Sequence, residues 1–113
     1  MTARATSQLL IQALIRTVQA EGGFATVIHK GDIVAGVILI LCIDTDHQTR
    51  LLERQPDFST GYTLAPIATQ YWGNEKEIAQ YIDRRRKSDP DLWVIELDIA
   101  DGERFAAAIL AAG

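Results

Sequence analysis

Apolar residues follow a helical period near the amino end of the chain and again in its second half. Apolar side chains spaced three and four residues apart predict one amphipathic helix from Thr6 or Ser7 to Ala20. Asn74, followed three residues later by a glutamate, has the spacing of a helix cap and predicts a second helix over residues 75–87. Each helix therefore has one apolar stripe that must pack against another element.

Other apolar stretches are rich in β-branched residues and predict strands. The expected strands cover residues 24–30, 33–43, 48–54, 62–65 and 92–99. Gly31-Asp32 has the composition of a tight turn, so the first two strands are expected to form an antiparallel hairpin. The alanine-rich residues 105–112 predict a short final helix.

This order of elements, α-β-β-β-(β)-α-β-α, predicts an α+β fold. We expect a single, mainly antiparallel twisted sheet of four to five strands, with helices packed mainly on one face. The last strand follows a helix, so its place in the sheet and its direction stay open. A chain of 113 residues has the usual length of one domain, and residues 1–113 are expected to form one.

Charge and hydropathy disfavour two classes of partner. The formal net charge of −4 argues against general nucleic-acid binding and against docking on an anionic membrane. The longest apolar run, Ile33–Ile43, is about half the length that a membrane-spanning helix needs. The amino end is a better amphipathic helix than a signal peptide, so the expected location is the cytoplasm.

Residue types that bind metals and cofactors are sparse in the sequence. Cys42 is the single cysteine and lies in an apolar run, where a buried and unreactive thiol is expected. His29 and His47 are expected near opposite ends of a hairpin, too far apart to share a metal ion. The chain has no phosphate-binding glycine loop and no zinc or nucleophile motif, so neither a metal nor a cofactor is predicted.

Glu96 and Asp98 are the candidate catalytic residues. A period of two puts Trp93 on one face of its strand, expected to be buried, and both carboxylates on the other. Their Cα atoms would lie about 6.6 Å apart, close enough to converge on one cation or to act as an acid–base pair. A solvent-facing pair at the end of a strand is the alternative.

Arg85 and Trp72 are the candidate ligand-binding residues. Arg85 continues the inward stripe of the second helix and is expected to pair with Glu96 or Asp98. Trp72 precedes the cap of that helix, where it would either close the helix entrance or form the wall of a binding site.

A cationic cluster occupies the last turn of the same helix. Arg84, Arg86 and Lys87 can favour the negative end of the helix dipole and aid solubility. They are also candidates for anion binding or for contact with a nucleotide.

The stretch from Ser88 to Asp98, with sequence SDPDLWVIELD, is the most distinctive part of the chain. Together with residues 22–27 (GGFATV), Lys30-Gly31-Asp32 and Gly36, it resembles the DUF1491 family of short alphaproteobacterial proteins. The resemblance covers nearly the whole chain but not residues 55–73. It implies a bacterial, cytoplasmic setting and no catalytic residues, since no activity is established for that family.

Two main hypotheses of function follow. The first is a small, non-enzymatic interaction module that self-associates, because no catalytic constellation accompanies the strongly apolar composition. The alternative is a small-ligand-binding protein or an enzyme that uses a cluster of Glu96, Asp98 and Arg85. A weaker third hypothesis is nucleic-acid contact through the cationic cluster.

Overall fold

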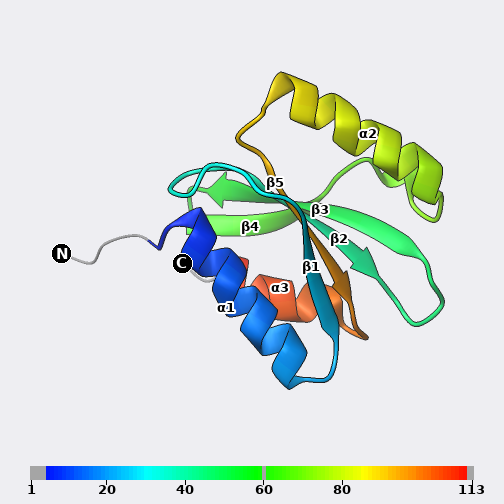
Figure 1. Cartoon of the computed structure of the whole chain (residues 1–113), viewed down its shortest axis with the longest axis horizontal. Coiled ribbons are helices and arrows are strands. Elements are labelled where there is room, and N and C mark those ends of the chain that lie inside the picture. The colour runs from blue at the N-terminus through cyan, green and yellow to red at the C-terminus, as the bar shows by residue number, and fades with distance from the viewer. Residues whose placement is uncertain (1–4, 60, 112–113) are drawn as a thin grey trace.

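A computed structural model describes residues 5–59 and 61–111 and contains a five-stranded sheet with helices on both faces (Figure 1). The helices are α1 (Ser7–Ala20), η1 (Thr69–Tyr71, a single 3-10 turn), α2 (Glu75–Ser88) and α3 (Gly102–Leu110). The strands are β1 (Phe24–His29), β2 (Ile38–Ile43), β3 (Thr49–Asp57), β4 (Gly61–Pro66) and β5 (Trp93–Asp98). The predicted α+β class and element order are confirmed.

The order of strands in the sheet is β1-β5-β2-β3-β4. Strands β2, β3 and β4 form the expected antiparallel meander, whereas β5 runs parallel to β2 and antiparallel to β1. The last strand therefore lies inside the sheet. Its apolar side chains are buried there on both faces, as is typical of a central strand.

The predicted hairpin between residues 24–30 and 33–43 is wrong, because β5 separates β1 from β2. Residues 33–35 form a turn, in which the Asp32 carboxylate accepts hydrogen bonds from the backbone N–H groups of Val34 and Ala35. A Cβ atom on Gly31 or Gly36 would overlap the Asp91 carbonyl oxygen. These glycines let the segment pass close to the start of β5 instead of turning back along β1.

Trp93 joins this segment to the core. The indole is 3% exposed, and its Nε1 donates a 2.7 Å hydrogen bond to the Asp32 carbonyl oxygen. The buried position expected for Trp93 is confirmed. Part of the stretch that carries the family resemblance thus meets at one structural corner, because Asp32 and Gly36 lie against Asp91 and Trp93, 55 or more residues away in sequence.

Two hydrophobic layers flank the sheet. Helices α1 and α3 cover one face, where Leu14, Trp93 and Leu97 lie in the larger core, and α2 covers the other, where Ile78 and Ile82 meet Val94 (Figure 1). Two of the three long helices therefore share a face. The cap predicted at Asn74 is present, since its Oδ1 accepts from the backbone N–H of Glu77 at 3.1 Å.

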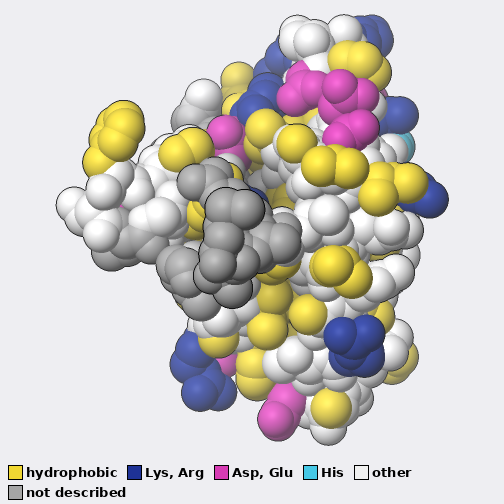
Figure 2. Space-filling model, turned by 90° about the vertical axis from the view of Figure 1, so that its left-hand side faces the viewer, with side chains coloured by type: hydrophobic (Ala, Val, Ile, Leu, Met, Phe, Trp, Pro, Cys, Tyr) yellow, Lys and Arg dark blue, Asp and Glu magenta, His cyan; other side chains and the backbone are white. Residues whose placement is uncertain are grey.

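Hydrophobic side chains also reach the surface. Figure 2 shows them at several places on the side of the molecule that lies to the left in Figure 1. Within the described residues, none of the helices is long and apolar enough to cross a membrane.

Candidate functional site

A groove lined by both ionisable and aliphatic side chains lies between α2 and the sheet. Its volume is about 300 Å³, and we call it the α2 groove. Its lining residues come from β1, β2, β3, β5 and α2: Ile28, His29, Leu41, Ile43, Thr49, Glu75, Ile78, Ala79, Ile82, Asp83 and Glu96. The surface is mainly aliphatic, with a few polar groups, as is common in small-molecule sites.

Glu96 lies on the sheet side of the α2 groove. The predicted alternation along β5 puts its side chain on the face opposite Trp93, and the structure places it there, on the face that α2 covers. Burial raises the pKa of the Glu96 carboxyl above its ordinary value, and the negative charges of Asp98 and Glu75 raise it further. In the described ranges, Glu96 has no ion-pair partner, so its charge is uncompensated by the protein.

His29 reaches the groove because of a β-bulge. The register between β1 and β5 shifts between Val27 and His29, which brings both Ile28 and His29 to the side of α2. Burial lowers the pKa of His29, the charge of Arg86 lowers it further, and Asp83 opposes both effects. The burial and the charge of Arg86 thus favour the neutral form of the imidazole.

Asp98 does not line the groove. It lies exposed at the end of β5, and it acts on Glu96 through its charge. The two predicted catalytic carboxylates are thus on one face of the sheet, but only Glu96 faces the groove.

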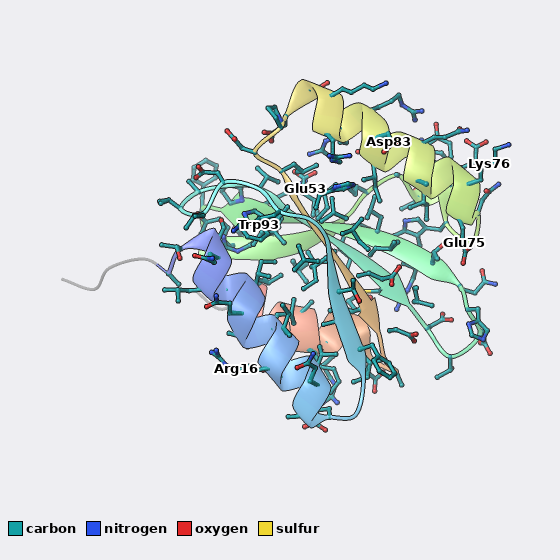
Figure 3. All side chains as sticks on the ribbon, in the orientation of Figure 1. Arg16, Glu53, Glu75, Lys76, Asp83 and Trp93 are labelled. Carbon is teal, nitrogen blue, oxygen red and sulfur yellow. The ribbon has the colours of Figure 1, made fainter. Side chains whose placement is uncertain are left out.

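Arg85 does not pair with Glu96 or Asp98, so that prediction is wrong. It donates a 2.8 Å hydrogen bond to Glu53 Oε1 and a 3.0 Å hydrogen bond to the Tyr81 hydroxyl. Figure 3 shows Glu53 on the sheet below α2. The pair joins α2 to β3, and the predicted cluster of Glu96, Asp98 and Arg85 does not form.

Arg85 also borders a second, more open hollow of about 310 Å³, together with Arg84, Tyr71 and Tyr81. Arg86 and Lys87 lie exposed in the last turn of α2, as expected for side chains that favour the helix dipole. Anion binding by these cations stays a prediction.

Trp72 lines neither hollow. Its Nε1 donates a 2.9 Å hydrogen bond to the Ile67 carbonyl oxygen, and its ring packs on the core under α2. The side chain therefore closes the entrance of α2, the first of its two predicted roles.

Thr49, Glu75 and Asp83 are groove residues that the sequence reasoning missed. Thr49 lies two residues before Leu51 on β3, so the two side chains point to the same, buried face of the sheet. A polar residue at such an inward position was the signal in the sequence that could have indicated a groove residue. Glu75 and Asp83 lie eight residues apart on α2, which puts them near one face of the helix, beside Ala79. Nothing local in the sequence predicts that this face lies over β5.

Cys42 is 2% exposed, and burial raises the pKa of its thiol to about 12. The buried thiol expected from the sequence is confirmed. Among the described residues, no group of three or more His, Cys, Asp or Glu side chains is placed to hold a metal ion.

Comparison with known proteins identifies the family. The model of "Protein of unknown function (DUF1491)" matches residues 5–107. The chain belongs to the DUF1491 family. No curated protein matches this DUF1491 chain.

Solved structures share the fold. A crystal structure of a DUF1491 family protein from Caulobacter crescentus is 30% identical, with a TM-score of 0.78 over 88% of this chain and 92% of that one. An NMR structure of a DUF1491 family protein from the same organism is 28% identical, with a TM-score of 0.79 over 92% and 94%. A protein from A. tumefaciens is 29% identical, with a TM-score of 0.71 over 97% and 95%.

Proposed function

We propose that this DUF1491 protein binds a small, positively charged organic molecule in the α2 groove. The observation that carries the proposal is the half-buried Glu96 carboxylate, which borders an aliphatic groove, has no ion-pair partner among the described residues and lies near the like charges of Asp98 and Glu75. A carboxylate in such surroundings gains free energy when a cation comes close.

The walls of the groove define the rest of the ligand. Leu41, Ile43 and Ile78 offer aliphatic surface, which favours a hydrocarbon part attached to the cation. The net charge of −4 also attracts cations to the protein as a whole. Of the predicted cluster of Glu96, Asp98 and Arg85, the proposed site retains Glu96, and other groove residues take the place of the two others.

Three six-carbon probes test the charge of the ligand: hexylamine, hexanol and hexanoate. We expect amide chemical-shift changes at groove residues with hexylamine, weaker changes with hexanol and none with hexanoate. Glu96→Gln should remove most of the preference for hexylamine, by about fivefold or more in Kd. Asp98→Asn, the same change of charge on the same strand but outside the groove, is the matched control and should retain most of it.

Equal binding of the amine and the alcohol by the wild-type protein would contradict the proposal. So would an effect of Asp98→Asn as large as that of Glu96→Gln, because general surface charge would then explain the preference.

Self-association through β1 is the second candidate, favoured by one specific observation. Strand β1 is an edge of the sheet, and its Phe24 and Ile28 side chains are 71% and 41% exposed. The strand contains no charged or proline residue of the kind that protects natural edges. Antiparallel pairing of two copies about Thr26 would put Phe24 of each copy opposite Ile28 of the other.

Light scattering over a wide concentration range tests this second candidate. We expect the mass to rise towards that of a dimer, and Thr26→Lys to keep the protein monomeric, because two lysines would face each other at the centre of the paired strands. The exposed Asp46→Lys, far from β1 in sequence, is the control. A wild-type mass that stays monomeric at the highest concentration would rule out pairing through β1.

The cytoplasmic location stays a prediction from the sequence.

A further inference from the structure

The carboxylates of the α2 groove are spread along it. Glu75 and Asp83 both belong to α2, and their eight-residue separation corresponds to roughly 12 Å along the helix axis. Figure 3 shows Glu75 at the amino-terminal end of α2 and Asp83 farther along the helix. Glu96 lies across the groove from them, on the sheet. Aliphatic side chains, among them Ala79, also line the groove.

Thr49 is a second, independent indication of a ligand. It borders the groove and is 2% exposed, and its Oγ1 has no hydrogen-bond partner in residues 5–59 and 61–111. Its carbonyl oxygen accepts a 3.0 Å hydrogen bond from the Gly73 N–H, which places Thr49 beside the start of α2 and near Glu75. A buried hydroxyl without a partner is costly, and a donor on a ligand would satisfy it.

We infer that the groove takes a linear aliphatic polyamine, an inference that rests on the proposed function. One ammonium group lies between Glu75 and Thr49, and a second lies towards Asp83. The methylene chain between them runs over Leu41 and Ile43, where Glu96 adds negative charge. An ammonium has three donors, so it can satisfy a carboxylate and a hydroxyl together. The groove volume of about 300 Å³ suits a free small molecule.

Calorimetric titrations of the whole protein at pH 7, where primary amines are protonated, compare three probes. These are octane with an amino group at each end, octylamine, and butane with an amino group at each end. The eight-carbon diamine is long enough for the roughly 12 Å between Glu75 and Asp83. We expect it to bind at least about fivefold more tightly than either other probe.

Similar affinities for octylamine and the eight-carbon diamine, within about twofold, would overturn the polyamine inference and leave the proposed function standing. Failure of all three amines to bind would overturn both.

Variants then locate the second ammonium group. Asp83→Asn should bring the affinity ratio of the eight-carbon diamine to octylamine close to one. Glu77→Gln makes the same change of charge on the same helix outside the groove, and should keep the ratio. Equal ratios in the two variants would overturn the placement of the diamine, and with it the inference.

Thr49→Val tests the buried hydroxyl without opening a cavity, since the two side chains have nearly the same shape. We expect at least about a threefold loss of affinity for the eight-carbon diamine, together with an unchanged or higher melting temperature. Thr63→Val on β4 is the control and should bind like the wild type. Wild-type affinity in a folded Thr49→Val protein would overturn the inference.

Discussion

At the scale of single residues, Glu96 is a partly buried carboxyl whose pKa is raised by burial and by the negative charges of Asp98 and Glu75. Its folded-state pKa is raised, so the folded protein holds a proton at pH values where the unfolded chain has already lost it. The groups around it are Asp98 on its own strand, Glu75 and Asp83 on α2, and His29 on β1, whose lowered pKa favours the neutral imidazole. None of them supplies a compensating positive charge.

The sign of the pH effect follows from this shift. As the pH rises from about 4.5 through the folded-state pKa, Glu96 ionises in an unfavourable place and the free energy of unfolding falls. We therefore expect Glu96→Gln to raise Tm at pH 7 by about 1–3 °C and to lose this advantage below pH 4.5. Asp46→Asn, in an exposed turn, should change Tm little at either pH. A Glu96→Gln protein that is less stable than the wild type at pH 7 would contradict this account of the site.

At the scale of secondary-structure elements, the position of α2 decides whether the groove exists. The ion pair between Arg85 and Glu53 joins α2 to β3, with side chains 29% and 17% exposed. The pair between Arg50 and Glu103 is more exposed, at 35% and 45%. Solvent screens an exposed pair more strongly, so the first pair should contribute more to stability.

Double-mutant cycles measure this difference. We expect a coupling free energy of about 1–3 kcal/mol between Arg85→Met and Glu53→Gln, and less than about 1 kcal/mol between Arg50→Met and Glu103→Gln. Urea unfolding of each single and double variant supplies the free energies. Loss of the first pair should also weaken hexylamine binding, because α2 forms one wall of the groove. Equal couplings in the two cycles would show that the first pair does not hold α2.

At the scale of the whole molecule, local sequence patterns predicted the helices and strands and the faces that they bury. They did not predict which strands and side chains distant in sequence pair with each other. The alternation along β5 was sufficient to predict that Trp93 is buried and that Glu96 lies on the opposite face. Asn74 also predicted the start of α2, because the capping hydrogen bond joins it to Glu77, only three residues away. These signals depend only on neighbours in sequence.

The partners of residues distant in sequence were not predictable in this way. The sequence contains a credible hairpin turn at Gly31-Asp32, yet β5 occupies the place beside β1 because its apolar side chains are buried on both faces there. Arg85 was expected to meet a carboxylate, and it does, but the insertion of β5 put Glu53 on β3 under that part of α2. The groove arises from this strand order.

The most direct test of the central claim is an NMR pH titration of the Glu96 side-chain carboxyl carbon, without and with saturating hexylamine. The account predicts a pKa above the ordinary value of 4.5 in the free protein, and a clear downward shift when the amine is bound. A pKa at or below the ordinary value in the free protein, or one that hexylamine leaves unchanged, would contradict the claim that Glu96 is the counter-charge of a cation site.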